Sequence, residues 1–349
     1  MAYTTINKST DYFNTKLYTG NGGTQSLTGV GFQPDFTWVK GRSVAEHHNL
    51  YDAVRGVTKP IYTNLNYGEG SASDSLTAFN SDGFSIGANA YINTNSATFA
   101  SWNWKAGTTG SGTTGGSGTA KAYSYSVNTT AGFSIVKYAG NGSAGHTIPH
   151  HLGAVPKMII VKDLTDNESW RVYHASTTDF RYYLELNTTA ATVQDSNVFD
   201  NVPTSSGFLV GSNNPVNNAT HNYIAYCFAE KTGYSKFGSY TGNGNADGTF
   251  VYTGFKPSFI MYKKSSGTGR WTLEDNKRDP FNVATHGVSA NGSSAENTGS
   301  QYWDVDLLSN GFKFRTTEQE TNQSGQTFIY MAFAEAPLVG SNNVPCTAR

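Results

Sequence analysis

The sequence predicts an all-β protein: three tandem β-sandwich domains, jelly-roll-like and related by internal repetition. Three observations predict this fold: the composition, apolar runs of strand length, and short sequence words that recur three times. The 349 residues include 38 Gly, 21 Tyr and 20 Phe, and only 14% are charged, against about 25% in typical soluble domains. This composition favours strands, turns and hydroxyl-rich surfaces over long helices.

The internal repeat begins with a five-residue word, YTGNG at 18–22, which returns as YAGNG at 138–142 and as YTGNG at 240–244. Four further words follow in the same order in each copy. Spacings of 120 and 102 residues are too long for a solenoid unit and fit a small domain. We therefore expect repeats over 1–105 with a short N-terminal arm, 121–231, and 232–349 with a C-terminal tail.

The words that follow are typical of strands. DFTWVK, KMIIVK and SFIMYK are apolar runs of strand length, each preceded by a proline, which a strand start tolerates. SDGFSIG, SSGFLVG and SNGFKFR place a turn dipeptide before a strand. TFASWNW, YIAYCFA and FIYMAFA alternate large and small residues. That alternation predicts a strand with a core on one side and another layer on the other.

The stretch between the first two repeats, AGTTGSGTTGGSGTA at 106–120, contains only small and hydroxyl-bearing residues besides one Ala at each end. It has no apolar side chain large enough to anchor it in a core. We therefore expect a flexible linker there.

The recurring first word has two interpretations, a tight turn that leaves the first strand or a ligand-binding loop. Gly and Asn adopt positive φ at low cost, and a phosphate loop would need a lysine and a following helix, which are absent here. We expect the turn, and expect Gly20→Val to be destabilising if Gly20 needs positive φ. The predicted turn residues are Gly20, Asn21, Gly22, Gly140, Asn141, Gly142, Gly242, Asn243 and Gly244.

Histidines are the second candidate site. His47 and His48 lie in EHHNLYD, and His146 and His150 lie in HTIPHH. A metal site can be built from such groups, but the other copies lack them, and adjacent histidines on a strand point to opposite faces. We expect polar loop residues on a surface that contacts a ligand or partner, with no metal and no cofactor.

The tryptophans are the third candidate, because aromatic faces beside amides and hydroxyls suit sugar surfaces. Trp303 lies in a less regular segment and is the predicted surface residue. The predicted core residues are Trp38, Trp102, Trp104, Trp170 and Trp271.

Paired carboxylates could indicate glycoside hydrolysis. Asp52 and Asp275 occupy matching places, each three residues before an arginine, Arg55 or Arg278. This spacing favours a local ion pair, and the second copy has no such couple. The nucleophile motif GxSxG is also absent, so we expect no enzyme.

Charge and targeting signals restrict the partners. A net charge of -1 and a pI near 6.7 give no general attraction to nucleic acid or anionic lipid. No apolar run approaches the roughly 20 residues of a membrane helix, and the N-terminus lacks the pattern of a secretory signal. Cys227 and Cys346 match no metal spacing, and the sequence leaves open whether they pair.

The words together carry a resemblance. YFNTKLYTGNG, DAVRGVTK, LTAFNSDGFSIG, NTNSATFASWNWKAG, YIAYCFAEKTGYSKFGSYTGNGNADGTFVYTGFKPSF and TFIYMAFAEAP resemble a repeat family of virion structural, tail-fibre-like proteins of marine tailed bacteriophages. The resemblance covers nearly the whole chain. The family has no agreed catalytic residues, so it implies a virion role and no chemistry.

The resemblance implies an external tail fibre, spike or appendage, assembled in the host cytoplasm with other virion proteins and released by lysis. Such a protein would contact host surface glycans, and a homotrimer is expected by analogy with other fibres. The absence of a heptad or collagen-like shaft keeps open a capsid decoration (cement) protein. A glycan-degrading virion enzyme is the weaker alternative.

Overall fold

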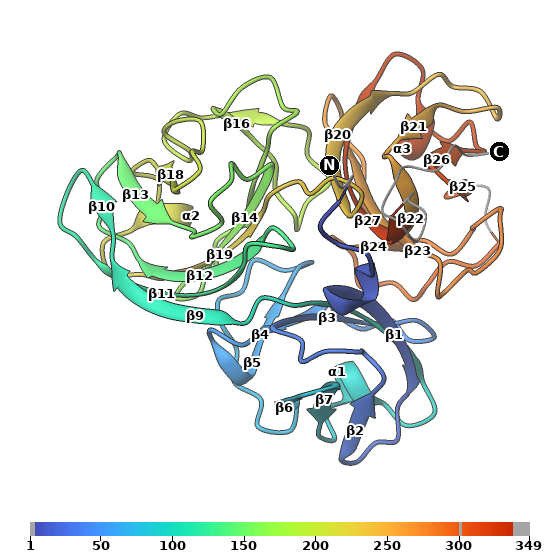
Figure 1. The fold of residues 1–349 in the computed structure, drawn as a ribbon, viewed down its shortest axis with the longest axis horizontal. Coiled ribbons are helices and arrows are strands. Elements are labelled where there is room, and N and C mark those ends of the chain that lie inside the picture. Colours follow the sequence, from blue (N-terminus) through green and yellow to red (C-terminus); the bar gives the residue numbers. More distant parts are fainter. Residues whose placement is uncertain (1–3, 300–301, 338–349) are drawn as a thin grey trace.

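The computed structural model describes residues 4–299 and 302–337. It consists of antiparallel β-sheets with a few one-turn helices, which confirms the all-β sandwich class. The chain forms three lobes around a common centre (Figure 1). We call them unit 1 (4–105), unit 2 (106–231) and unit 3 (232–337).

Unit 1 pairs a five-stranded sheet, in the order β1-β8-β3-β4-β5, with a three-stranded sheet, β2-β7-β6. Its elements are η1 (Ser9–Asp11), β1 (Phe13–Thr19), β2 (Gln25–Thr28), β3 (Phe36–Gly41), β4 (Asn49–Asp52), β5 (Gly56–Tyr62), β6 (Leu76–Asn80), β7 (Gly83–Ile86), α1 (Ala90–Asn93) and β8 (Thr98–Trp104).

Unit 2 has a six-stranded sheet, β15-β14-β19-β12-β11-β9, a three-stranded sheet, β10-β13-β18, and the pair β16-β17. Its elements are β9 (Thr108–Thr113), β10 (Gly115–Gly116), β11 (Ala122–Asn128), β12 (Phe133–Ala139), β13 (His146–Pro149), β14 (Met158–Asp163), β15 (Arg171–His174), β16 (Tyr182–Tyr183), β17 (Val193–Gln194), β18 (Gly207–Val210), α2 (Asn214–Asn217) and β19 (Asn222–Phe228).

Unit 3 repeats the plan of unit 1, with sheets β20-β27-β22-β23-β24 and β21-β26-β25. Its elements are β20 (Ser235–Thr241), β21 (Phe250–Tyr252), β22 (Phe255–Lys264), β23 (Trp271–Asp275), β24 (Val288–Ser289), β25 (Val305–Leu308), β26 (Gly311–Phe314), α3 (Gln319–Asn322) and β27 (Thr327–Pro337).

The prediction of a flexible linker over 106–120 is wrong. This stretch supplies β9 and β10, and β9 pairs with β11 along its whole length. Two of its glycines lie against tyrosine side chains: a Cβ at Gly110 would lie 2.6 Å from Tyr125, and one at Gly112 would lie 2.9 Å from Tyr123. A run of small residues can therefore be a strand that carries aromatic neighbours.

Each unit has an inner core between its large and small sheets. In unit 1, for example, Tyr18, Val39 and Phe99 of the large sheet pack with Leu27 and Phe84 of the small sheet. Separate inner cores fill unit 2 and unit 3. The three large sheets are therefore each covered on one face by a small sheet of the same unit.

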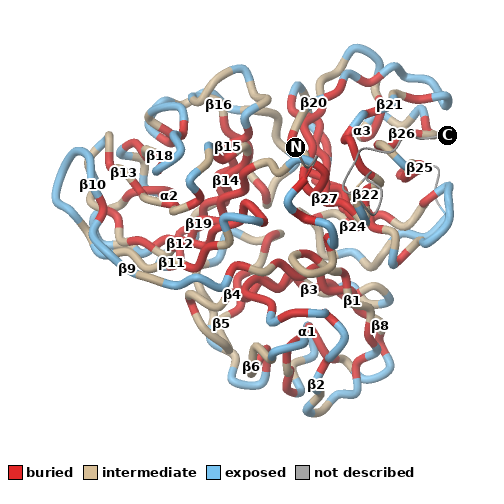
Figure 2. Tube along the Cα trace, viewed as in Figure 1, coloured by how far each residue is buried: buried red, intermediate tan, exposed pale blue. Residues whose placement is uncertain are grey.

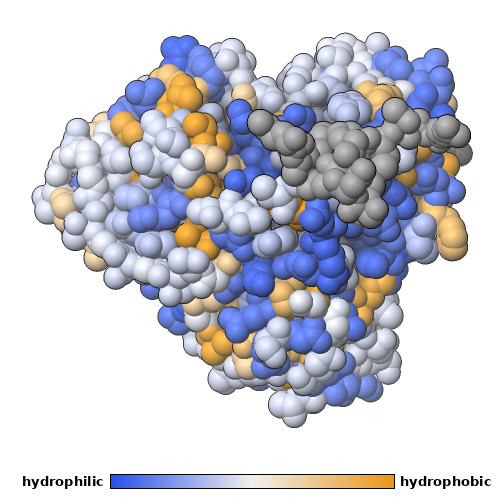
Figure 3. Space-filling model, viewed as in Figure 1, coloured by the Kyte–Doolittle hydropathy of each residue, from blue (hydrophilic) through white to orange (hydrophobic). Residues whose placement is uncertain are grey.

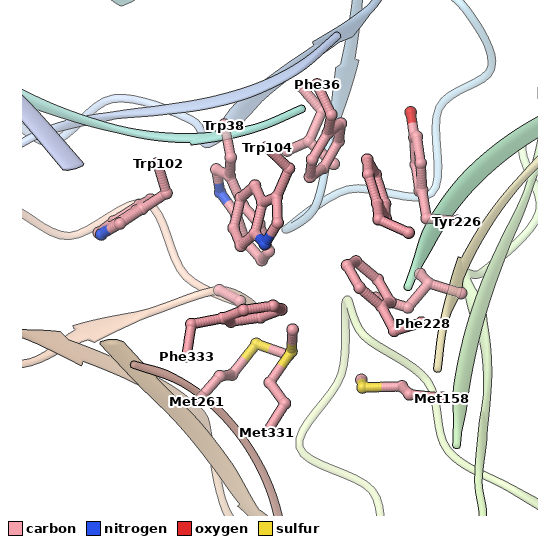
Figure 4. Close-up of a cluster of buried hydrophobic side chains, with 14 of the residues drawn as sticks. Phe36, Trp38, Trp102, Trp104, Met158, Tyr226, Phe228, Met261, Met331 and Phe333 are labelled. Atoms are coloured by element: carbon pink, nitrogen blue, oxygen red, sulfur yellow. The ribbon is translucent and has the colours of Figure 1, made fainter. Parts of the chain in front are cut away.

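The other faces of the large sheets meet in one central core shared by all three units. It includes Trp102 and Trp104 from unit 1, Phe228 from unit 2, and Met331 and Phe333 from unit 3 (Figure 4). The buried segments accordingly gather around the centre of the molecule in Figure 2. This explains why TFASWNW is buried at every position but the first, as its alternation predicted.

The units meet head to tail through equivalent residues. Tyr226 of unit 2 donates a hydrogen bond to Asp52 Oδ2 of unit 1 at 2.8 Å, and Trp102 Nε1 of unit 1 donates to Asp275 Oδ2 of unit 3 at 3.0 Å. Both donors lie at the same position of the central strand of their large sheet. Both acceptor aspartates are the last residue of the sequence word that follows the apolar strand run in their own unit.

The third junction closes the cycle by different chemistry. His174 of unit 2 stands where the other units have aspartate, and its Nε2 lies 3.1 Å from the Tyr330 carbonyl oxygen of unit 3. The equivalent donor position in unit 3 is Met331, which has no N–H or O–H to donate. The backbone carbonyl therefore replaces the side chain at this junction.

A second set of contacts follows the same order. Trp170 Nε1 of unit 2 donates to the Tyr62 carbonyl of unit 1 at 3.0 Å, and Trp271 Nε1 of unit 3 donates to the Glu185 carbonyl of unit 2 at 2.9 Å. The chain thus forms a closed ring of three repeats with an approximate threefold arrangement, held by one shared core.

Candidate functional site

The YTGNG word of unit 1 belongs to the structural frame. Tyr18 donates its hydroxyl proton to the Ile92 carbonyl at 2.7 Å. The buried side chain of Asn93 accepts from the backbone N–H of Asn21 at 2.8 Å and donates to Asn21 Oδ1 at 3.0 Å. The word therefore attaches the end of β1 to the one-turn helix α1.

The same attachment recurs in the other units. It uses Tyr138 with the Val216 carbonyl and Asn141 with Asn217 in unit 2, and Tyr240 with the Thr321 carbonyl and Asn243 with Asn322 in unit 3. The three buried asparagines end the helices α1, α2 and α3. With its polar groups used in this way three times, the word serves the fold and carries no ligand chemistry here.

Glycine is required at two positions of the YTGNG word for two different structural reasons. Positive φ belongs to the second glycine, +67° at Gly22, with +75° at Gly142 and +66° at Gly244. The first glycine is required by close packing, because a Cβ at Gly20 would lie 2.2 Å from the Thr94 carbonyl oxygen. Gly20 does not have positive φ, so the condition on which Gly20→Val was expected to be destabilising is not met, and close packing supplies the reason instead. The equivalent glycines are Gly140 and Gly242, where a Cβ would lie 2.2 and 2.3 Å from a carbonyl oxygen.

The Asp–Arg couples are local ion pairs, as their spacing predicted. Arg55 Nε lies 2.5 Å from Asp52 Oδ2, and Arg278 Nε lies 2.5 Å from Asp275 Oδ2, with all four side chains fully buried. Burial opposes ionisation of Asp275, but Arg278 holds the pKa of this carboxyl below its ordinary value. The pairs present their aspartates to the neighbouring unit and stand in no cavity.

His47 and His48 do not form one surface. His48 is buried, and its Nδ1 accepts a hydrogen bond from Trp38 Nε1 at 2.9 Å. His47 is half-buried, with Nδ1 2.7 Å from Asn64 Nδ2 and its ring edge-on to Tyr91. The prediction of a contact surface is therefore wrong for His48, and only His47 reaches solvent.

His146 and His150 are buried as well, so the surface prediction is wrong for both. His146 lies between Asn217, 2.9 Å away, and the Thr114 hydroxyl, 2.6 Å away. His150 Nε2 lies 3.0 Å from the Thr204 carbonyl oxygen. Burial lowers the pKa of both rings, which favours the neutral form.

Trp303 is 3% exposed, and the prediction of an exposed sugar-binding ring is wrong there too. The Arg270 guanidinium lies 5.8 Å from the centre of its ring. The indole also packs against Gly287, where a Cβ would lie 2.6 Å from it. Trp303 lines one side of a cavity of about 380 Å³. The side chains directly before and after it in the chain point to the opposite side of this segment.

A different surface of unit 3 carries exposed aromatic rings. In the small sheet β21-β26-β25, Val251, Phe312 and Val305 point into the inner core. Successive side chains of a strand alternate between faces, so Phe250 and Tyr252 point outward, where they are 43% and 59% exposed. We call this face, which lies away from the centre of the molecule (Figure 1), the unit-3 outer face.

The outer face is crossed by a charged network next to the aromatic rings. Phe250 pairs with Lys313, which pairs with Asp306 on the third strand. Lys313 Nζ lies 2.7 Å from Asp247, and Arg315 Nε lies 2.5 Å from Asp306. The basic side chains are therefore matched by carboxylates, which leaves no free positive charge at this place.

The outer face ends in a cavity of about 720 Å³, on the opposite side of the 302–304 segment from the Trp303 cavity. Asp304, Arg315 and Glu318 are among its lining residues, together with Tyr302, which is 53% exposed. Asp304 Oδ1 is buried and has no hydrogen-bond partner among residues 4–299 and 302–337. Burial raises the pKa of this carboxyl.

Other kinds of site are not found in the described part of the chain. It contains no group of three or more His, Cys, Asp and Glu side chains placed to hold a metal ion. None of its helices is long and apolar enough to cross a bilayer. Cys227 is a buried free thiol, and Cys346 lies outside the described residues.

The fold and the outer face define a three-repeat β-sandwich protein with one distinctive surface. The chain belongs to the family described as a domain of unknown function (DUF7483), whose match covers residues 8–337. This match spans all three units, in agreement with their shared core. No curated protein and no solved structure shows significant similarity to the chain.

Sequence reasoning missed the outer face, although the repeats contain its signal. In TFVYTGF the outward positions are Phe250 and Tyr252, and the matching residues of unit 1 are Ser26 and Thr28. In unit 2 they are Thr147 and Pro149. Comparing copies position by position would have shown two aromatic residues where the other copies have small ones.

Proposed function

We propose that this protein is a structural component of a bacteriophage particle, placed externally as part of a tail fibre, spike or appendage. The virion assignment rests on the resemblance carried by the repeated words. A closed ring of β-sandwiches with one shared core is a stable building block, which supports a long-lived structural role. Its assembly in the host cytoplasm and release by lysis are part of the same proposal.

The observation that carries a host-contact role is the difference between the units. Phe250 and Tyr252 are exposed on unit 3 only, where the matching positions of units 1 and 2 hold Ser, Thr or Pro. Most of the face seen in Figure 3 is hydrophilic or intermediate, with apolar residues in small separate groups. Exposed aromatic residues beside polar groups mark binding surfaces. We therefore assign glycan contact to the unit-3 outer face.

A capsid decoration protein is the second candidate. The described residues form a ring of three lobes without a shaft (Figure 1), and this shape favours decoration over a complete fibre. In either position the neighbours are other virion proteins. The homotrimer expected by analogy stays a proposal, to be measured by light scattering of the purified chain, because the threefold arrangement seen here lies within one chain.

Localisation in the particle tests this function. Antibodies against the purified chain, detected with gold in electron micrographs of intact phage, are expected to label the tail or its appendages. Labelling confined to the head would support decoration and contradict the fibre. Particles without the chain would contradict both. Release of reducing sugars from host polysaccharide would instead revive the enzyme alternative.

A further inference from the structure

Strand β9 leaves one edge of the unit-2 sheet open. It is the last strand in the order β15-β14-β19-β12-β11-β9, and within residues 4–299 and 302–337 it pairs with β11 alone. Every residue of β9 except Gly110 is exposed, and the strand lies at the outer margin of unit 2 (Figure 1, Figure 2). An open edge presents a row of backbone groups to which another strand can pair.

The pairing with β11 decides which backbone groups face the open edge. Thr114 N–H donates to the Lys121 carbonyl at 2.8 Å. In an antiparallel pair, residues alternate between bonding the neighbouring strand and pointing away from it. The even-numbered residues of β9 therefore bond β11. The odd-numbered residues, Thr109, Ser111 and Thr113, turn their N–H and C=O groups to the open edge.

The large sheets of units 1 and 3 protect their edges, whereas β9 does not. In unit 1 the edge strand β1 carries Lys16, and the edge strand β5 carries Lys59 and Pro60. In unit 3 the edge strand β20 carries Lys236, and β24 is only 2 residues long. Lysine, proline and short length all discourage pairing with another chain. β9, with the sequence TTGSGT, has none of these features.

The sequence of the open edge favours a second copy of the same strand. Residues 108–114 read TTGSGTT, which is the same in both directions about Ser111. Two antiparallel copies related by a twofold axis at Ser111 would place Thr109 opposite Thr113 of the partner subunit. In that register the outward-facing residues meet one another, so that each N–H finds a carbonyl. The segment has no charged residue, so no like charges come together.

We propose that two copies of this chain pair antiparallel through β9 and join their six-stranded sheets into one. The proposal goes beyond the proposed function, because it is the same for a tail appendage and for a capsid decoration. β9 occurs once in each chain, so the contact closes at two copies and predicts a dimer in place of the trimer expected by analogy. The strands are short and their side chains small, so the dimer should dissociate on dilution, with a Kd of about 1–100 µM.

Light scattering and sedimentation of the full chain across this concentration range test the proposal. The mass is expected to approach twice the 37.6 kDa of one chain at high concentration. The N–H of Ser111 faces the open edge, so Ser111→Pro removes a donor at the centre of the contact and leaves the bonds to β11 in place. This variant should dimerise about tenfold more weakly or not at all. The matched control, Ser111→Ala, keeps the N–H and should dimerise as the unchanged protein does.

A second pair of variants tests the register without proline. Thr109→Lys with Thr113→Lys places like charges opposite one another and should abolish the dimer. Thr109→Lys with Thr113→Glu places opposite charges together and should keep it. Thermal melting shows that each variant folds. A chain that stays monomeric throughout the range, a trimer, or equal dimerisation by all variants would overturn the proposal. Gold labelling of the particle does not depend on this contact, so a failure here is distinct from a failure of the virion assignment.

Discussion

Unit 3 and unit 1 share one plan, and two of the differences between them are informative. The strand order of both sheets is the same, and the Tyr–Asn attachment of the first word is present in both. On the outer face, however, Phe250 and Tyr252 replace Ser26 and Thr28. The attachment of the first word is thus the same in both units, whereas the residues on the outer face differ.

The second difference lies in the inner core. Unit 1 has the buried Tyr51 opposite Thr37, whereas at the equivalent place unit 3 has the buried Glu274 opposite Ile260. Tyr262 donates to Glu274 Oε1 at 2.7 Å, but Oε2 has no partner among the described residues. The buried carboxyl with one unpaired oxygen lowers the stability of unit 3. Unit 1 has a tyrosine at this position and avoids that loss.

The largest expected effect concerns the junctions between units. Asp52→Ala leaves Arg55 buried without this carboxylate and removes the acceptor of Tyr226. Arg55 then keeps only the Glu69 carboxylate, 3.3 Å from its Nη1. We expect a loss of about 3–5 kcal/mol in the free energy of unfolding, because removing one partner of a buried ion pair is costly. Urea unfolding of the two proteins measures it.

The matched control at the third junction is His174→Ala. His174 is neutral in the fold, because burial lowers its pKa to about 4, and across the junction it makes one hydrogen-bond contact, to the Tyr330 carbonyl, besides a ring contact with Phe237. We expect a smaller loss, of about 1–3 kcal/mol for a broken buried hydrogen bond. Equal losses for the two variants would show that the aspartates have no special role in closing the ring.

The next effect concerns the glycine of the first word. Gly20→Ala places a Cβ 2.2 Å from the Thr94 carbonyl oxygen, and forcing atoms into a packed site costs about 1–3 kcal/mol. Gly115→Ala is the control, because a Cβ at Gly115 meets no atom within 4 Å. Thermal unfolding should separate the two variants, and identical melting temperatures would remove close packing as the reason for Gly20.

A smaller effect depends on pH. Burial raises the pKa of Glu274 to about 8, so the folded protein keeps a proton that the unfolded chain has lost above its ordinary pKa. Stability from this group is therefore complete at low pH and is lost as the pH rises towards 8. The side chain of Glu274→Gln cannot ionise. The difference in the free energy of unfolding between Glu274→Gln and the unchanged protein should therefore grow by about 1 kcal/mol from pH 7 to pH 8.5, in favour of the variant. A pH-independent difference would contradict this account.

The frame of the fold could be read from the sequence because it is repeated. The alternation in TFASWNW and the apolar run DFTWVK predicted strands with both faces covered, and the structure buries Trp38, Trp102 and Trp104 between two layers. The shared central core could not be predicted. Nothing in one strand says whether its second face meets another sheet of the same unit or a neighbouring unit.

The predicted contact surface was mostly wrong for a physical reason. Polar residue types suggest solvent, but His146 is fully buried once Asn217 and Thr114 satisfy its two ring nitrogens. Composition misled in the same way at 106–120, where the residues that cover Gly110 and Gly112 come from a later strand. Long-range partners decide both cases, and a single sequence does not reveal them.

The central claim is that the outer face of unit 3 meets the host while the repeated frame only supports it. The most direct measurement compares two double variants. In the test variant, Phe250→Ser and Tyr252→Thr give unit 3 the residues of unit 1. In the control variant, Ser26→Ala and Thr28→Ala change the matching positions of unit 1. Both double variants should unfold within about 0.5 kcal/mol of the unchanged protein, as surface changes do. Blocking of phage adsorption by the purified proteins is then compared. We predict that the unit-3 variant loses the block and the unit-1 variant keeps it; equal blocking by both would contradict the claim.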